Sequence, residues 1–246
     1  MNEISQIAGV GGISRSNRSS GWIESRSRSP ALSKSHAILS LGDYLDIDAI
    51  QSCFDAVPLD RYVEAGFRHK SICRVRVRDH VVLPTAHGAL FQPKEFNPVH
   101  GDIVRHYEEM EPRLAELLRP VIQIFAACAL LCHDHEVLVQ AQRITASAGE
   151  DGTTGFPVVE GWHRDNTQVL GIFLANRVNV EGGISLLSRD SSGDKLAFAR
   201  TLAVGELLLI DDNVNWHNTT PIKKVRENAP AHRDVVLLTW PSCREL

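Results

Sequence analysis

The sequence has few of the features that would each point to a membrane, secreted or nucleic-acid-binding protein. Among its 246 residues no apolar run approaches the length of a membrane-spanning helix, and no charged-then-apolar signal peptide follows Met1. The formal charge of −4 and the isoelectric point near 6.3 show no basic excess that would favour nucleic acid or anionic membranes. We therefore expect a small-molecule partner, and neither nucleic acid nor a membrane.

Cysteine is also scarce, and the five cysteines lack the even number and spacing of a disulfide framework. Cys128 and Cys132 lie four residues apart in an apolar helical stretch, so we interpret them as small core residues. A reduced cytoplasm is the simplest setting for such a chain. The oligomeric state is left open by the sequence, with a homodimer as one option.

Large apolar residues are rare in the first 36 residues, which are rich in Ser, Arg and Gly instead. Such a segment buries too little apolar surface to offset the entropy of ordering it, so we predict a disordered leader over residues 1–36. Its Arg-Ser pairs also allow an RNA-binding interpretation, which is the weaker one. The remaining residues, 37–246, are long enough for one domain with a substantial core.

Apolar periodicity changes from helical to alternating along this domain. Helices are predicted over Asp46–Val57 and Arg113–His133, the second one kinked or split at Pro120. Helices followed by many strands predict a mainly β (α+β) fold, in which helices flank a double-stranded β-helix, the cupin-like jelly roll. The predicted strands are Val137–Thr145, Gln168–Val178, Ile184–Ser188, Leu196–Thr201, Glu206–Ile210 and Arg233–Trp240.

A histidine and an aspartate two residues apart, His163 and Asp165, are the most informative motif. Alternate side chains of a strand point to the same face, so this pair can bind one metal ion. His217 can supply a third ligand from another strand. Two histidines and one carboxylate form the facial triad of non-haem Fe(II) oxygenases, which leaves positions open for cosubstrate and O2. The same ligands also suit zinc, and a zinc metallohydrolase is the weaker alternative.

Arg233 begins the last predicted strand and shares one face with Val235 and Leu237. An arginine that faces an apolar interior needs a carboxylate partner. A 2-oxo dicarboxylic acid offers its far carboxylate to Arg233 while its 2-oxo acid end chelates the iron. The alternative is a structural ion pair with a protein carboxylate such as Asp234.

Six segments occur in the order found in bacterial 2-oxoglutarate/Fe(II) dioxygenases of the L-isoleucine hydroxylase type, which the chain resembles over roughly residues 50 to 240. Asn166 departs from that pattern, where a glycine is expected. The segments are Arg61–Arg68, Gln92–Gly101, Val159–Asp165, Asn179–Gly183, Asp211–Ile222 and His232–Trp240.

The resemblance implies an enzyme that uses Fe(II), 2-oxoglutarate and O2. In it, His163, Asp165 and His217 would be the catalytic metal ligands, and Arg233 would bind 2-oxoglutarate. The implied reaction hydroxylates an unactivated carbon of a free L-amino or imino acid, either isoleucine-like or cyclic like pipecolate and proline, with succinate and CO2 as coproducts. The alternative is the same chemistry on a carrier- or peptide-bound amino acid.

Three further residues are candidates for substrate binding. If the apolar Val139 face of the predicted strand Val137–Thr145 lines the barrel, Arg143 points inward and can bind a substrate carboxylate. Glu160 can pair with a substrate ammonium, and Arg164 is a second candidate for the carboxylate. The structural alternatives are an ion pair between Arg143 and Glu160, and a solvated position for Arg164.

Overall fold

The computed structural model describes residues 32, 35–95, 99, 101–131 and 133–242. The predicted leader therefore lies almost wholly outside the described residues, as does the predicted core position of Cys132. The first strand, β1, begins at His36, and both Leu32 and Ser35 are buried. Within the described residues, no helix is long and apolar enough to span a membrane.

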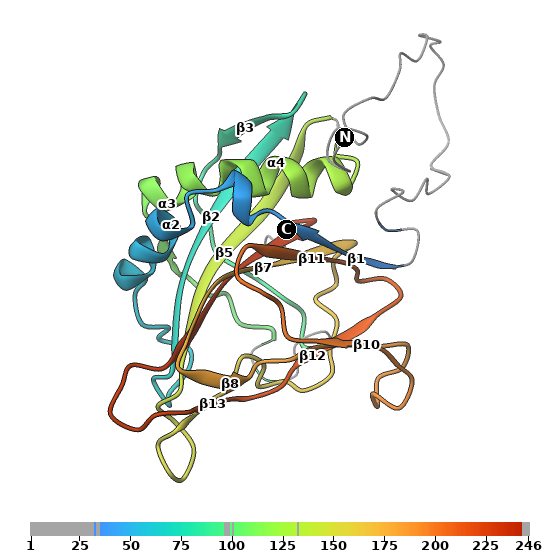
Figure 1. The fold of residues 1–246 in the computed structure, drawn as a ribbon. Coiled ribbons are helices and arrows are strands. Elements are labelled where there is room, and N and C mark those ends of the chain that lie inside the picture. The colour runs from blue at the N-terminus through green and yellow to red at the C-terminus, as the bar shows by residue number, and fades with distance from the viewer. Residues whose placement is uncertain (1–31, 33–34, 96–98, 100, 132, 243–246) are drawn as a thin grey trace, which may run out of the picture.

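The fold is mainly β, with one large sheet, two small sheets and a layer of helices (Figure 1). In the large sheet all neighbours pair in antiparallel fashion, apart from β4 (Glu108–Glu109), which pairs with β2 in parallel. The strands of this sheet follow the order β1 (His36–Ser40), β11 (Glu206–Asp211), β7 (Val169–Val178), β14 (His232–Trp240), β5 (His135–Thr145), β2 (Arg68–Arg78) and β3 (Val81–Pro84).

The two small sheets lie opposite the lower part of the large sheet in Figure 1. Together with the large sheet they form the predicted jelly roll with flanking helices. One small sheet has the order β10 (Leu196–Arg200), β9 (Ser185–Ser188) and β12 (Trp216–Thr219), and the other has the order β6 (Thr154–Gly155), β13 (Ile222–Lys224) and β8 (Val180–Gly182).

The predicted helices are present with shorter bounds. Asp46 caps α2 (Ile47–Cys53) by accepting a hydrogen bond from the backbone N–H of Ala49 at 3.0 Å. The second predicted helix is split as expected at the proline, into α3 (Pro112–Leu117) and α4 (Arg119–Cys128). Pro120 occupies the first turn of α4, where its missing N–H costs no hydrogen bond.

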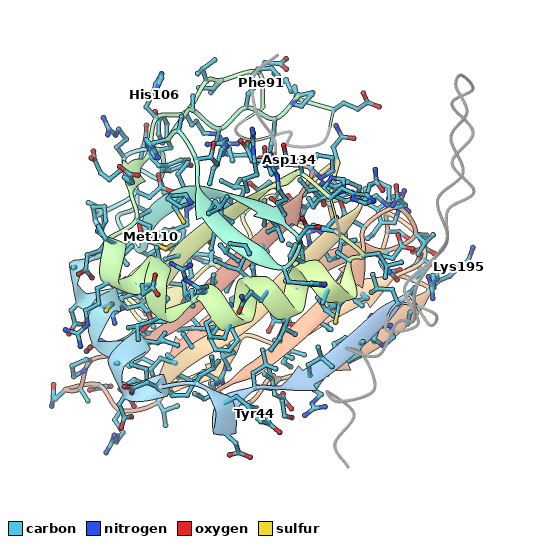
Figure 2. All side chains as sticks on the ribbon, turned by 90° about the horizontal axis from the view of Figure 1, so that it is seen from above. Tyr44, Phe91, His106, Met110, Asp134 and Lys195 are labelled. Carbon is cyan, nitrogen blue, oxygen red and sulfur yellow. The ribbon has the colours of Figure 1, made fainter. Side chains whose placement is uncertain are left out.

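The helices cover one face of the large sheet, and α3 and α4 lie across its strands in Figure 2. Phe125 of α4 packs so closely that a Cβ at Gly171 of β7 would lie 2.9 Å from its ring. A glycine at this position therefore allows the helix to approach the sheet. Val139 and Ala141 of β5 also belong to this helix-covered core.

The Val139 face of β5 therefore points toward the helices, so the condition under which Arg143 would point into the barrel is not met. The opposite face, with Leu138, Gln140 and Gln142, lines a cavity between the large sheet and the small sheets. Both faces of β5 are largely buried, so burial gives no signal for which one faces the helices.

Candidate metal and cosubstrate site

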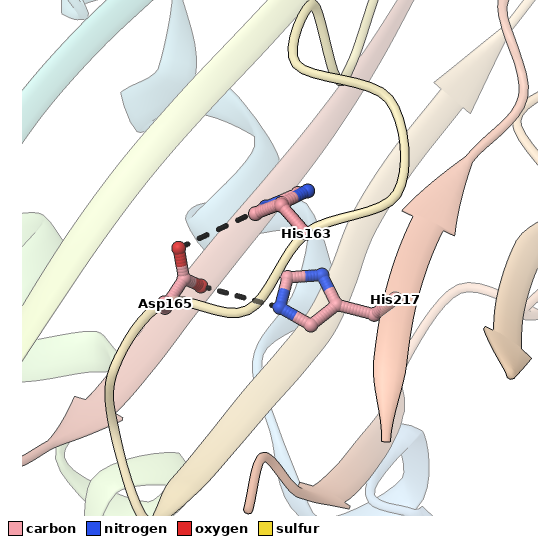
Figure 3. A group of neighbouring side chains, drawn as sticks. All are labelled: His163, Asp165 and His217. Carbon is pink, nitrogen blue, oxygen red and sulfur yellow. Dashed lines mark ion pairs between the residues drawn. The ribbon is translucent and has the colours of Figure 1, made fainter. Parts of the chain in front are cut away.

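His163, Asp165 and His217 come together at the cavity (Figure 3). One ligand atom from each residue lies within 4.8 Å of the others. Nε2 of His163 is 3.8 Å from Oδ1 of Asp165, and Nε2 of His217 is 3.5 Å from Oδ2 of the same carboxylate. The two histidines and the carboxylate thus converge as the HxD spacing and the third histidine require.

Backbone pairing fixes the distance between the two histidines. The N–H of His163 donates to the carbonyl of His217 at 3.2 Å, and the N–H of His217 donates to the carbonyl of His163 at 3.0 Å. Nδ1 of His163 lies 2.9 Å from the carbonyl of Gly161. With the proton on Nδ1, the lone pair of Nε2 is directed to the metal position.

Asp165 lies on a loop whose turn is completed by Asn166. The φ of Asn166 is +59°, in the left-handed region that glycine favours and that asparagine tolerates better than most residues. The asparagine therefore adopts the backbone conformation for which a glycine would be expected.

Asp212 is a buried acid beside the triad that the sequence did not single out. Its Oδ2 accepts hydrogen bonds from the backbone N–H groups of Asp165 and Thr167, at 3.0 and 3.1 Å, and from the Thr167 hydroxyl at 3.2 Å. Its Oδ1 lies 3.2 Å from Nε2 of His217, yet neither of these two atoms has a well-aligned hydrogen bond. Asp212 therefore holds the Asp165 loop and leaves Nε2 of His217 available for a metal ion.

The protonation of the histidines differs between the two. Burial lowers the pKa of His163, helped by the neighbouring His217, against the attraction of Asp165. Burial also acts to lower the pKa of His217, but Asp212 and Asp165 outweigh it and raise that pKa. Two carboxylates thus compensate a positive charge at His217, and the same negative environment attracts a metal cation.

Gln92 and Arg105 connect the triad to the opposite wall of the cavity. Nε2 of Gln92 donates to Oδ1 of Asp165 at 3.2 Å, and Nη2 of Arg105 donates to Oε1 of Gln92 at 2.7 Å. Both residues are buried and line the cavity. This chain of hydrogen bonds orients the carboxylate of Asp165 toward the two histidines.

Arg233 lines the same cavity and is 3% exposed. Its Nε and Nη2 are buried without a hydrogen-bond partner in the described structure. Burial lowers its pKa to about 10, helped by Arg177 and opposed by Asp234. The structural alternative, an ion pair with Asp234, is not found, because both oxygens of Asp234 accept hydrogen bonds from Arg143.

Gly183 creates the space that the Arg233 side chain needs. Its φ is +65°, and a Cβ there would lie 3.1 Å from Cδ of Arg233 and 2.9 Å from Nη1 of Arg177. A side chain at this position would therefore collide with the two arginines. The guanidinium of Arg233 remains beside the cavity, with two donors available for an anion.

Arg143 does not line the cavity, so its predicted inward position is wrong. Its Nε and Nη2 donate to the two oxygens of Asp234 at 2.7 and 2.9 Å, and its Nη1 donates to Asp55 at 2.7 Å. The alternative pair with Glu160 is also absent. The reason is the orientation of β5, which directs Arg143 to the helix-covered side of the sheet.

The other two substrate candidates have different surroundings. Glu160 lines the cavity, and its Oε2 accepts a hydrogen bond from the backbone N–H of Val159 at 3.1 Å. Arg164 stacks on Trp216, with its guanidinium carbon 4.8 Å from the ring centroid. Arg164 is half-buried, so it is not the solvated loop residue that the structural alternative predicted. It also does not line the cavity.

Comparison with known proteins identifies the class of this enzyme. Residues 51–239 match the family described as 2OG-Fe dioxygenase, and the chain belongs to that family. It is therefore an enzyme, a 2-oxoglutarate-dependent dioxygenase that uses Fe(II), 2-oxoglutarate and O2. This membership decides against the zinc metallohydrolase.

Solved structures share this fold at low sequence identity. A bsmA homolog from Methylobium petroleophilum PM1 has a TM-score of 0.72 and 22% identity, over 85% of this chain and 89% of that chain. IDO from Bacillus thuringiensis has a TM-score of 0.66 and 16% identity, over 84% and 89%. The Fe(II)/α-ketoglutarate-dependent dioxygenase TqaL has a TM-score of 0.60 and 14% identity, over 85% and 83%. No curated protein matches the sequence significantly.

The residues at the cavity fit iron and 2-oxoglutarate. The buried, unpartnered Nε2 of His217 and the nearby His163 and Asp165 would hold Fe(II). The two unpartnered donors of Arg233 would bind the far carboxylate of 2-oxoglutarate, which removes the cost of a buried cation without a partner.

Replacing Asp212 should weaken Fe(II) binding while the triad itself is intact. In Asp212→Ala, three donors on the Asp165 loop lose their shared acceptor, and we expect Fe(II) affinity to fall about 10- to 100-fold. Anaerobic Fe(II) titration followed by calorimetry measures this. The control is Asp194→Ala, which replaces an exposed aspartate distant from the triad in sequence. Its Fe(II) affinity should match that of the unmodified chain. Unchanged affinity in Asp212→Ala would show that the loop holds its position without this carboxylate.

Proposed function

We propose that this dioxygenase hydroxylates an unactivated carbon of a free L-amino or imino acid, aliphatic or cyclic. The observation that carries the proposal is the composition of the cavity wall next to the triad. Glu160 offers a carboxylate for a substrate ammonium, and an apolar patch offers contact for an aliphatic side chain or ring. The patch consists of Leu138, Ile144, Leu170, Ile172, Val235 and Leu237.

The protein residues have separate tasks in this reaction. His163, Asp165 and His217 hold the metal, and Arg233 orients 2-oxoglutarate by its far carboxylate. Bound Fe(II), with 2-oxoglutarate and O2, supplies the oxidising power, while the cosubstrate becomes succinate and CO2. The apolar patch would press one substrate carbon toward the metal position and exclude water from it.

A free amino acid is also favoured by the sequence segments that resemble the L-isoleucine hydroxylase type. The cavity is lined both by Arg233, the proposed 2-oxoglutarate anchor, and by Glu160 with the apolar patch, so it offers separate wall segments to the cosubstrate and to an amino acid.

The proposal is tested by following succinate with the Fe(II)-loaded protein, 2-oxoglutarate, O2 and a panel of free amino acids that includes L-isoleucine, L-proline and L-pipecolate. We expect one amino acid to stimulate succinate formation and to gain one oxygen atom, as read by mass spectrometry. Asp165→Ala protein under identical conditions is the control. Succinate formation that no free amino acid stimulates would contradict the proposal and favour a carrier- or peptide-bound substrate.

A further inference from the structure

Lys70 is a buried lysine on the cavity wall that the proposed reaction has not used. It lies on β2, opposite Gln142 of β5, which in turn lies opposite Val235 of β14. These three side chains line the cavity, so Lys70 projects into it from two strands away. Lys70 is 5% exposed.

The ammonium of Lys70 has a ring contact but no acceptor in the described structure. Its Nζ lies 4.5 Å from the centroid of the Tyr107 ring, an arrangement that attracts the cation without accepting a hydrogen bond. The neighbouring arginines, in contrast, donate hydrogen bonds to protein side chains. Arg68 donates to Asp60 at 2.7 Å, and Arg105 donates to Gln92. An ammonium that lines a cavity and has no protein acceptor can offer its three donors to an anion there.

The position of Lys70 differs from that of Arg233. Arg233 of β14 lies opposite Ile144 of β5, which lies opposite Arg68 of β2. Arg233 and Lys70 are therefore separated by two strand spacings across the sheet and by two residues along the strands. At about 4.8 Å per strand, their Cα atoms are about 12 Å apart. The two cations thus reach the cavity from β2 and β14, with β5 between these two strands.

The carboxylates that line the cavity do not satisfy Lys70. They are Glu160 and Asp165, and neither forms an ion pair with Lys70 in the described structure. Asp165 is a proposed metal ligand, and Glu160 influences both histidines of the triad. A carboxylate on a bound ligand would therefore give the ammonium of Lys70 the direct ion-pair partner that the cavity wall does not provide.

We propose that Lys70 binds the carboxylate of the primary substrate, with the unpartnered Nε of Arg105 on the same side of the cavity as a second donor. The inference rests on the proposed function in one respect, since it assigns the carboxylate of an amino acid to Lys70. It also names a class of ligand independently: a small aliphatic monocarboxylate.

The protonation of Lys70 provides a readout specific to this role. Burial, together with the nearby Arg68 and Arg105, lowers the pKa of Lys70 to about 7, against the opposing attraction of Asp60 and Asp165. A neutral amine cannot form an ion pair, so carboxylate binding should weaken as the pH rises above about 7. An arginine at this position stays protonated, so Lys70→Arg should remove this pH dependence.

The experiment measures binding by calorimetry to the holoenzyme with Fe(II) and 2-oxoglutarate under anaerobic conditions. The first probe series is L-isoleucine, 3-methylpentanoate (which lacks the ammonium) and 2-methylbutylamine (which lacks the carboxylate). The second series is L-proline, cyclopentanecarboxylate and pyrrolidine. The variants are Lys70→Met, Lys70→Arg and the control Lys195→Met, a lysine on the exposed surface in Figure 2.

In at least one series we expect the amino acid and the acid to bind, and the amine to bind weakly or not at all. We expect Lys70→Met to lower the binding affinity of the amino acid and of the acid about 10- to 100-fold. Lys70→Arg should retain binding at pH 7 and above, Lys195→Met should be unchanged, and the affinity for 2-oxoglutarate should stay within about twofold in all three.

The other possible outcomes contradict either the role of Lys70 or the proposed hydroxylation of a free amino acid. Equal binding of the acids by unmodified and Lys70→Met protein overturns the inference, even if an amino acid is hydroxylated. A loss of 2-oxoglutarate affinity in Lys70→Met, instead of a loss for the acids, also overturns it. Lys70-dependent binding of the acids without hydroxylation of any amino acid supports the inference and contradicts the proposed function. Failure of every carboxylate to bind overturns the inference as well.

Discussion

Asp165→Ala should lose at least about a thousandfold in substrate-stimulated succinate formation while the protein stays folded. The carboxylate is the single anionic member of the proposed triad, and removing it leaves two neutral donors for a dication. Stabilisation of charge by a ligated metal is worth several kcal/mol, and each 1.36 kcal/mol corresponds to a tenfold change in rate. Succinate assays and anaerobic Fe(II) titration of the variant measure the effect.

The fold should tolerate this change because Asp165 is on a loop at the cavity and is only partly buried. His163→Ala is the companion variant and should show the same loss of activity, since both residues belong to one unit. Asp194→Ala serves as the matched control for a lost aspartate. Full activity in either Asp165→Ala or His163→Ala would remove the triad assignment.

Arg233→Met should raise the KM for 2-oxoglutarate about 30-fold or more. Truncating one member of a buried, hydrogen-bonded charge pair costs about 2–5 kcal/mol of binding. Stability should not fall, since Arg233 is 3% exposed without an ion pair and methionine removes a buried charge. The KM follows from succinate formation at increasing 2-oxoglutarate, and the melting temperature from thermal unfolding.

Arg143→Met is the matched control, because the same substitution on the adjacent strand should have the opposite effect. It removes the arginine partner of Asp234, whose side chain is fully buried, and we expect a loss of about 3–5 kcal/mol of folding stability. The KM for 2-oxoglutarate of the folded fraction should be unchanged. An equal KM in Arg233→Met and the unmodified protein would place the 2-oxoglutarate anchor elsewhere.

Much of the architecture could be predicted from local sequence signals. Alternation of apolar residues found β5, β7 and β14 within two residues of their bounds, and Pro120 marked the break between α3 and α4. β2 was missed because Arg68, Lys70, Arg74 and other basic residues interrupt its pattern. Strands are usually recognised by alternating apolar residues, and charged side chains interrupt that alternation. The pattern failed in β2 because some of the basic side chains of this strand line the cavity.

Some residues of the candidate site could be predicted from the sequence, and others could not. His163 and Asp165 are neighbours in sequence, and their spacing defines their common direction. Lys70, Gln92, Arg105 and Asp212 come from distant segments and became recognisable only when folding placed them around the cavity. Lone polar residues carry no signal of this kind in one sequence, because most of them are exposed on the surface.

By itself the sequence determined the candidate metal-binding motif, the order of helices and strands, and the presence of an arginine at the start of the last strand. These are local properties, set by spacing along the chain. The tertiary structure decided which face of β5 lines the cavity, and with it that Arg143 pairs with Asp234 while Gln140 and Gln142 face the site. The physical reason is that a strand buried on both sides has no polar face to orient it, so packing of the helices against Val139 and Ala141 makes the choice.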